Sequence, residues 1–188
     1  MTKKDIGAIL KTAISLFLIC AVAAGLVAFV NSVTHDTIQA NDLAAETEAK
    51  SAVLTSAASF EDVTLASGAA GWIGKTEAGE IAGYVFSTSA SGYGGKIDIM
   101  TGFAPDGHVT GVQILSIEET PGLGMNAKRE SFLNRFIDTD GELSVIKNAD
   151  PGQNEILAIT SATITSRAMV KAVNAARDCF NEVTGKGE

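Results

Sequence analysis

The sequence predicts an α+β protein in which a single N-terminal transmembrane helix is followed by an extracytoplasmic antiparallel sheet packed by helices. Three observations predict this class. A long uncharged apolar run lies near the N-terminus, short alternating segments follow it between glycine-rich turns, and two stretches nearer the C-terminus have helical periodicity. At 188 residues the chain is long enough for one well-cored domain with a small appendage, and too short for two large domains.

The apolar run is long enough to cross a membrane. It extends from Thr12 to Val30 without a charge, and as a helix it would span about 28 Å at roughly 1.5 Å per residue. Three lysines precede it and the next basic residue is Lys50, so the positive-inside rule places the N-terminus in the cytoplasm and the rest of the chain outside. A cleaved signal peptide is the alternative, although its apolar core would usually be only about 7–15 residues long. A lipoprotein signal is excluded at Cys20, because Ile19 stands where such sites have a small residue.

The remaining composition divides the chain into three regions. These are the cytoplasmic N-terminus with the anchor at 1–31, a stalk of one or two helices at 32–58, and the main domain at 59–188. After Val30 there are 11 basic and 21 acidic residues, and this acidic balance disfavours nucleic-acid binding. The two cysteines, Cys20 and Cys179, cannot pair with each other and provide neither a disulfide framework nor a cysteine metal site.

Alternating segments of the main domain predict strands at 60–65, 81–87, 96–103 and 109–117. The turn Pro105-Asp106-Gly107 would join the last two in an antiparallel hairpin, because Pro fixes φ and Gly accepts a positive φ. Helical periodicity predicts amphipathic helices at about 127–137 and 165–183, each of which needs a sheet face to cover. Segments 143–146 and 155–159 could add two further strands.

The densest polar cluster lies where the last apolar segment meets the last helix, and it comprises Thr160, Ser161, Ala162, Thr163, Ile164, Thr165 and Ser166. Unpaired N–H groups and the positive end of the helix dipole stabilise phosphate at a helix start, and hydroxyl groups add further donors. Capping of the helix by Thr163, Thr165 or Ser166 is the alternative interpretation of the same residues.

This cluster resembles the flavinylation signature of the FMN-binding domain family, which is Ser-Gly-Ala-Thr followed by Ile-Thr-Ser and a helix. Upstream segments are similar to the other hallmark region of that family, in the same order and spacing: Gly92-Tyr93-Gly94-Gly95-Lys96-Ile97, Gly111-Val112 and Glu118-Glu119-Thr120-Pro121-Gly122-Leu123-Gly124. The resemblance covers nearly the whole chain. Within the family it is closest to the G subunits of Rnf ferredoxin–NAD oxidoreductase complexes, which are related to the C subunits of Na⁺-translocating NADH:quinone reductases.

The resemblance implies an electron-transfer subunit of a membrane complex that couples electron flow between ferredoxin and NAD to transport of Na⁺ or H⁺. It implies covalent FMN, held through a phosphoester on Thr163 and attached by a flavin transferase, with other integral-membrane and redox subunits as partners. The polar cluster and the loop from Glu119 to Gly124 would contact the flavin. Where the family usually has glycine this chain has Ser161, which adopts a positive φ less readily.

Several alternatives remain open from the residues alone. The loop 119–124 is also typical of an ordinary surface loop, Gly92–Gly95 of a hairpin turn, and Trp72 of a core or membrane-interface residue rather than a flavin-stacking one. His35 and His108 lack ligand spacing, so we predict neither a metal site nor a His-based catalytic pair. A non-redox anchored assembly or binding subunit and an extracytoplasmic enzyme with a noncovalent flavin are the two alternative functions.

Overall fold

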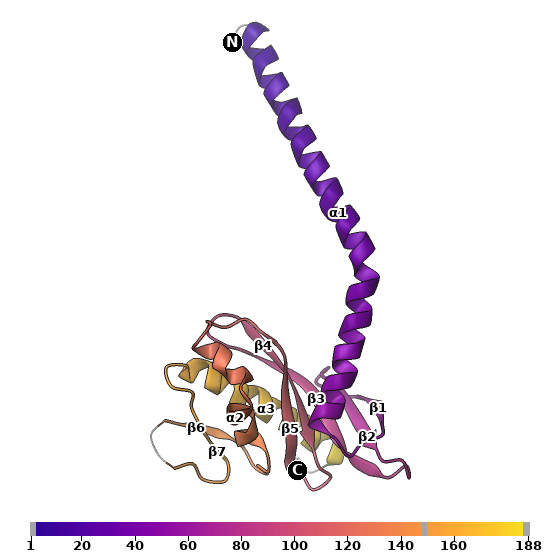
Figure 1. Ribbon diagram of the computed structural model, residues 1–188, viewed down its shortest axis with the longest axis vertical. Coiled ribbons are helices and arrows are strands. Elements are labelled where there is room, and N and C mark those ends of the chain that lie inside the picture. The colour runs from indigo at the N-terminus through magenta and orange to yellow at the C-terminus, as the bar shows by residue number, and fades with distance from the viewer. Residues whose placement is uncertain (1–2, 148–149, 186–188) are drawn as a thin grey trace. The chain divides into compact units, whose positions relative to one another are not determined.

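The computed structural model describes residues 3–147 and 150–185, and it describes their side chains except at 3–10, 12 and 36–43. It divides into two compact units, residues 1–44 and residues 45–188 (Figure 1). The first unit belongs to one long helix, α1 (Lys3–Val53), whose final turns are part of the second unit. The stalk segment is therefore one continuous helix up to Val53 rather than two.

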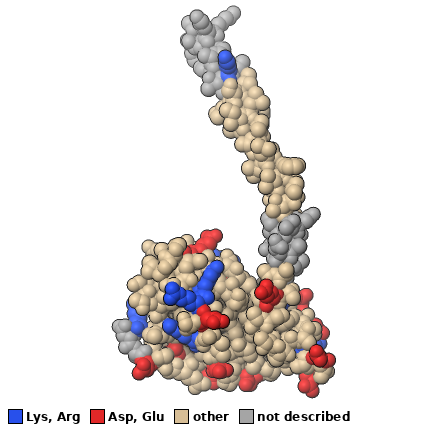
Figure 2. Space-filling view, in the orientation of Figure 1, with Lys and Arg blue, Asp and Glu red and all other residues tan. Residues whose placement is uncertain are grey.

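The first unit contains a segment suited to a membrane. Within the described part of the chain, Ala13–His35 is the one helical stretch long and apolar enough to cross a bilayer, with a mean hydropathy of 2.7 and none of its surface buried. Figure 2 shows this stretch as a continuous surface without charged side chains. The predicted N-terminal apolar helix is therefore confirmed, whereas its orientation stays a prediction.

The second unit is built on a five-stranded antiparallel sheet in which each strand pairs with the next along the chain (Figure 1). The strands are β1 (Ser59–Thr64), β2 (Ala70–Lys75), β3 (Ile81–Ser91), β4 (Lys96–Phe103) and β5 (Val109–Ile117). Four of them were expected, and the bounds of β4 and β5 are those predicted. The glycine-rich β2 was not predicted, and it brings Trp72 into the sheet.

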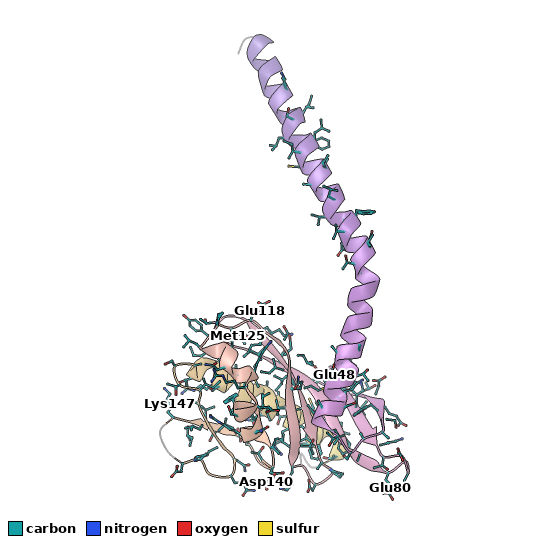
Figure 3. All side chains as sticks on the ribbon, viewed as in Figure 1. Glu48, Glu80, Glu118, Met125, Asp140 and Lys147 are labelled. Carbon is teal, nitrogen blue, oxygen red and sulfur yellow. The ribbon has the colours of Figure 1, made fainter. Side chains whose placement is uncertain are left out.

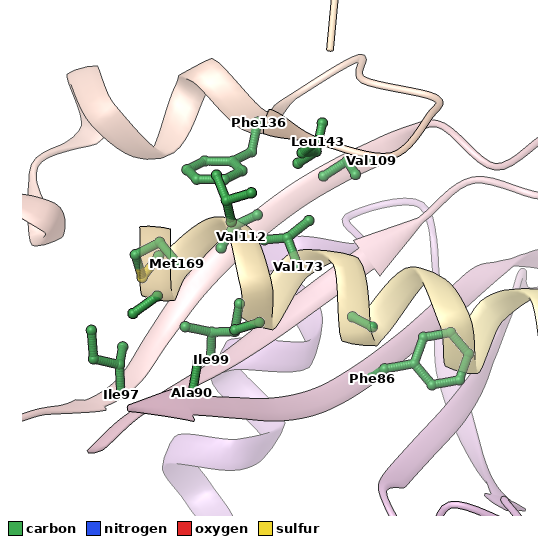
Figure 4. Packing of buried hydrophobic residues seen from close by; sticks show 14 of the residues in the cluster. Phe86, Ala90, Ile97, Ile99, Val109, Val112, Phe136, Leu143, Met169 and Val173 are labelled. Carbon is green, nitrogen blue, oxygen red and sulfur yellow. The ribbon is translucent and has the colours of Figure 1, made fainter. Parts of the chain in front are cut away.

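One face of the sheet packs against α3 (Thr163–Thr184), the helix predicted at 165–183. Figure 4 shows Met169 and Val173 of this helix above Ile97, Ile99 and Phe86 of the strands. These side chains belong to one large apolar cluster that is almost fully buried. The amphipathic stripe predicted from the sequence is therefore the face that α3 buries.

The helix expected at 127–137 is wrong in form. The structure has three short turns instead: the 3₁₀ turn η1 (Gly124–Lys128), the α-helical turn α2 (Glu130–Leu133) and the 3₁₀ turn η2 (Asn134–Phe136). Arg129 has extended backbone, with ψ 133°, and it separates the first turn from the second. Phe132 and Phe136 are nevertheless buried in the core. The apolar residues that predicted a helix are therefore placed in the core by successive short turns.

The two short segments 143–146 and 155–159 form a parallel pair apart from the main sheet. They are β6 (Ser144–Ile146) and β7 (Glu155–Leu157). β7 leads directly into the loop that precedes α3, and Ile156 is fully buried. This pair therefore fixes the approach of the chain to the start of α3.

The opposite face of the sheet receives the end of α1. Neighbouring strands carry four glycines there, and we call this set the glycine seat: Gly74, Gly83, Gly102 and Gly111. A Cβ atom at Gly111 would lie 2.9 Å from Val53 Cα, and one at Gly83 would lie 2.8 Å from a methyl group of Leu54. Thr110 Oγ1 donates a hydrogen bond of 2.5 Å to Val53 O. The end of α1 thus lies directly on the backbone of the sheet, where side chains would keep it away.

Candidate functional site

A pocket of about 420 Å³ opens where three distant segments meet. Its lining comes from the β3–β4 turn, the loop after β5 and the start of α3: Tyr93, Glu119, Thr120, Leu123, Gly124, Ser161, Ala162, Thr163, Ile164 and Thr165. Figure 3 labels Glu118 and Met125, which flank the loop segment of this lining. The two sequence motifs, which are far apart along the chain, therefore line one pocket.

The start of α3 leaves backbone donors free at the pocket. Ala162 occupies the N-cap position, and no side chain caps the helix. Ser166 N–H donates to Ala162 O at 3.0 Å, so the N–H groups of the preceding three residues have no acceptor within the helix. The alternative that Thr163, Thr165 or Ser166 is the N-cap residue is wrong. A helix start with free N–H groups favours an anion.

Ser166 is committed to the local structure instead. Its hydroxyl accepts from Ile159 N–H at 2.9 Å and donates to Ala162 O at 3.0 Å, and the residue is fully buried. These bonds close the turn that carries the chain from β7 into α3. Ser166 therefore stabilises the turn before α3 and does not itself line the pocket.

Ser161 lies in the left-handed region, with φ 64°. The turn around it is closed by a hydrogen bond of 3.0 Å from Ala162 N–H to Ile159 O. Residues other than Gly, Asn and Asp rarely adopt this conformation. The structure thus gives a physical reason for a glycine at this position of the signature, and it shows the serine in the conformation that a glycine would adopt.

Glu119 joins two walls of the pocket. Its carboxylate accepts from Tyr93 N–H at 2.7 Å through one oxygen and from Gly94 N–H at 3.3 Å through the other. The residue is buried, at 8% exposure. A Cβ atom at Gly124 would lie 2.6 Å from Glu119 Oε2 and 2.8 Å from Thr165 Oγ1, so glycine lets the carboxylate approach α3. The charge of Glu119 is thus engaged by backbone donors.

The loop after β5 is a folded turn with an apolar side chain at the pocket. Thr120 O accepts from the N–H groups of Leu123 and Met125, each at 3.2 Å, and Gly122 supplies a φ of 76°. Leu123 and Ile164 both line the pocket and are 42% and 51% exposed. Among the described residues, no Lys or Arg is in the lining. The pocket therefore offers apolar side walls, hydroxyl groups and free backbone donors.

The structure brings most of the predicted site residues together. Nine of the thirteen line the pocket, while Thr160, Pro121, Gly122 and Ser166 do not. Thr160 is exposed beside the pocket, and Pro121 and Gly122 are exposed in the loop. Contact of these residues with a flavin stays a prediction.

Tyr93 is the pocket residue that sequence reasoning did not assign to the site. The glycines around it are indeed a hairpin turn, closed by Gly92 N–H donating to Gly95 O at 2.8 Å. The tyrosine between them lines the pocket. Two signals pointed to it: the segment Gly92–Ile97 resembles the hallmark region of the family, and one large aromatic residue interrupts a glycine turn.

Trp72 does not line this pocket. It is buried with Val53, Val85 and Met100 on the face of the sheet that receives α1. Lys50 Nζ lies 4.6 Å from the centroid of its ring, a cation–π contact. Trp72 is therefore a core residue, and the alternative of flavin stacking is not supported.

Comparison with known proteins gives this arrangement a context. A family model described as the FMN-binding domain matches residues 92–178, and one described as the RnfG N-terminal region matches residues 1–53. The G subunit of the Na⁺-translocating ferredoxin:NAD⁺ oxidoreductase complex of Acetobacterium woodii is 38% identical over an alignment of 186 positions, and this alignment covers 88% of each chain. This chain belongs to the family of G subunits of ion-translocating oxidoreductase complexes.

Further members of this family match along almost their whole length. The G subunit of the proton-translocating ferredoxin:NAD⁺ oxidoreductase complex of Clostridium ljungdahlii is 31% identical over 183 residues, covering 97% of each chain. Among solved structures, NqrC of Shewanella oneidensis is 20% identical, with a TM-score of 0.49 over 55% of this chain and 52% of the other. The resemblance found in the sequence is confirmed by the family match.

Proposed function

We propose that this subunit relays electrons within a membrane-bound, ion-translocating ferredoxin–NAD oxidoreductase complex, through FMN held as a phosphoester on Thr163. The observation that carries this proposal is the position of Thr163. It is the first residue of α3, it is half-buried, and it lines the pocket. A phosphate on its hydroxyl would lie beside the free N–H groups of the helix start, which stabilise negative charge.

The other hydroxyls of the cluster are less suitable. Ser166 is occupied by two hydrogen bonds, Thr165 is 1% exposed, and Thr160 does not line the pocket. Ser161 is the remaining accessible hydroxyl, but it precedes the N-cap and lies outside the helix start. Attachment to Thr163 therefore combines access with the electrostatic advantage of the first helical turn.

The pocket fits the rest of the group as well. Leu123 and Ile164 offer apolar surface to a flat ring, and the hydroxyls of Thr120 and Ser161 can bond its polar edges. When bound, FMN supplies the electron chemistry, and the protein positions it. A tether also prevents loss of the cofactor in an extracytoplasmic space. We place the domain on that side of the membrane because of the lysines that precede the span.

Covalent attachment can be tested directly. The full chain is co-expressed with a flavin transferase, denatured, separated on a gel and examined for flavin fluorescence that stays with the band. We expect a fluorescent band for the wild type, for Thr160→Ala and for Ser161→Ala, and none for Thr163→Ala. Peptide mass spectrometry would identify the modified residue. Absence of flavin from the wild-type band, or its survival in Thr163→Ala, would refute attachment at this residue.

The relay role is separated from an assembly role by a second experiment. Membranes that carry the whole complex with Thr163→Ala in this subunit are compared with wild-type membranes. We expect the complex to assemble, because the substitution leaves the fold intact, and ferredoxin–NAD electron transfer to be lost. Undiminished electron transfer in an assembled complex without this flavin would favour the non-redox alternative.

A further inference from the structure

Tyr93 is an unusual side chain for the place where it lies. It is 72% exposed, more than any other large apolar side chain described in the globular unit, yet it lines the pocket. A tyrosine buries a large apolar area when it has a partner, so this exposure leaves an aromatic face available. Among the described residues, the pocket contains no other tyrosine or tryptophan, because Tyr84 packs on Phe180 and Trp72 lies in the other core cluster.

The backbone that carries Tyr93 is held in place. Glu119 accepts hydrogen bonds from the N–H groups of Tyr93 and Gly94 with its two carboxylate oxygens. The glycines of the turn pack directly on the segment that contains Glu119. A Cβ atom at Gly94 would lie 2.6 Å from Glu118 O, and one at Gly92 would overlap the Glu119 carboxylate. The turn is therefore fixed before any ligand arrives, which reduces the entropy lost on binding.

The opposing walls of the pocket are apolar and partly exposed. Leu123 comes from the loop after β5 and Ile164 from the first turn of α3, so three segments each present one large side chain at the pocket. A flat aromatic ligand would cover such surfaces, and aromatic faces prefer offset stacking or edge contacts with one another. The charge of Glu119 is already engaged by N–H donors, so the side of the pocket near Tyr93 is available for apolar contact.

We propose that Tyr93 is the residue against which the flavin ring packs, and that Glu119 is the positioning residue that holds it there. This inference rests on the proposed function only for the identity of the ligand. It assigns a ring contact to a residue outside the signature that carries the tether. It also gives the buried carboxylate of Glu119 a role in the pocket, because both of its oxygens accept hydrogen bonds from the turn that carries Tyr93.

The test uses the fact that a phenol close to an excited flavin quenches its fluorescence by electron transfer, whereas a phenyl ring does not. In the flavin-loaded full chain, Tyr93→Phe should raise flavin fluorescence severalfold and leave quenching by added iodide unchanged, since the ring is still covered. Tyr93→Ala should raise both. Tyr84→Phe is the matched control, because it removes the same hydroxyl in the distant core and should change neither.

Glu119→Gln tests the positioning role. A glutamine can accept only one of the two N–H donors, and its amide group faces the other, so the turn should loosen. We expect flavin fluorescence to rise part of the way toward the Tyr93→Ala value with the thermal midpoint of the core little changed. An unchanged fluorescence would show that Glu119 does not position Tyr93.

A second measurement does not depend on covalent loading. Riboflavin, which cannot form the phosphoester, is added to the unmodified full chain in detergent while the ring resonances of the two tyrosines are observed by NMR. We expect the Tyr93 resonances to shift and those of Tyr84 to stay. If wild-type chain shows no covalent flavin, the proposed function fails, and this measurement still decides the inference. Unshifted Tyr93 resonances at saturating riboflavin, or unchanged fluorescence in Tyr93→Phe, would overturn the proposal.

Discussion

Replacement of Ser161 by glycine should stabilise the protein. Ser161 has φ 64° and is exposed, so removal of its side chain relieves backbone strain without loss of packing. A left-handed residue other than glycine costs roughly 1–2 kcal/mol, and glycine lowers stability by about 0.4–1 kcal/mol through the entropy of the unfolded chain. The difference between these two ranges has its midpoint at a net gain of about 0.8 kcal/mol for Ser161→Gly.

Two further variants make this prediction specific. Thr160→Gly changes a neighbouring exposed residue whose φ is not positive, so only the entropic loss of about 0.4–1 kcal/mol should remain, with the opposite sign. Ser161→Val places a β-branched residue in the left-handed region and should lower stability by about 1 kcal/mol or more. The three variants should thus rank in the order Ser161→Gly, Thr160→Gly, Ser161→Val.

Unfolding is followed by the fluorescence of Trp72, the single tryptophan of the chain, which is buried in the globular unit. For a domain of this size, a change of 1 kcal/mol corresponds to roughly 4 °C in the thermal midpoint. Equal midpoints for Ser161→Gly and Ser161→Val would refute the assignment of Ser161 to the left-handed region. The yield of covalent flavin in the same variants would show whether the strained serine also limits attachment.

Three further outcomes follow from other parts of the fold. Gly102→Ala should destabilise the globular unit by about 1–3 kcal/mol in denaturant titrations, because the added Cβ would overlap Val53 O and lie 2.6 Å from Thr110 Oγ1. Gly152→Ala is the control: its Cβ would meet its nearest atom at 3.4 Å, so the free energy of unfolding should change by no more than about 0.5 kcal/mol. Arg177→Lys should lower the free energy of unfolding by about 2 kcal/mol, because the Arg177 guanidinium donates to Gly107 O and Thr139 O and lies over the Phe103 ring. Arg167→Lys, at an exposed arginine, is the control and should have little effect on the same measurement. His108 N–H donates to Asp106 Oδ1 at 3.1 Å, and the His108 imidazole lies 3.2 Å from the same oxygen. These contacts hold the pKa of Asp106 below its usual range. The stabilisation they give is complete above the unfolded pKa of about 3.9 and is lost as the pH falls through the lower folded pKa. A carboxyl NMR titration should find that low midpoint, and His108→Ala should raise it only in part because the backbone donor remains.

The sheet could be predicted where its strands alternate. β4 and β5 have the predicted bounds. In β4, Ile97, Ile99 and Phe103 belong to the apolar cluster that includes α3, whereas Met100 belongs to the cluster on the other face. β2 could not be predicted in the same way. Gly71 and Gly74 lower its strand propensity, and both are needed because side chains from other segments lie against them: a Cβ at Gly71 would be 2.9 Å from the Phe86 ring, and one at Gly74 would be 2.5 Å from a Leu54 methyl group.

The turns at 124–136 show a different limit. A spacing of four between Phe132 and Phe136 is helical, and the two rings do meet edge to face at 5.4 Å. The periodicity says nothing of the extended Arg129 before them or of Asp138 after them, which has φ 62°. Tertiary packing of the two rings in the core decided the local form, as it commonly does for short apolar stretches.

The candidate site could be predicted only in part from its residues. The start of α3 and its hydroxyls are visible in the sequence, but from the residues alone capping is the favoured explanation, and the structure instead has Ala162 as the N-cap. That the loop at 119–124 lies beside the start of α3 came from the family resemblance. Tyr93 was missed because the carboxylate that fixes it, Glu119, lies 26 residues away and has no local pattern.

The glycine seat also determines where the soluble part of this protein can be cut from its anchor. A fragment that begins at Ser59 would lack Ala49, Val53 and Leu54, which are buried, and would leave the backbone of four strands uncovered at the seat. Such a bare, flat surface without side chains invites association with other chains. A fragment that begins at Ala45 keeps the turns of helix that cover it. For structural or redox work on the isolated domain, the final turns of α1, from Ala45 to Val53, should therefore be kept, because they cover the glycine seat.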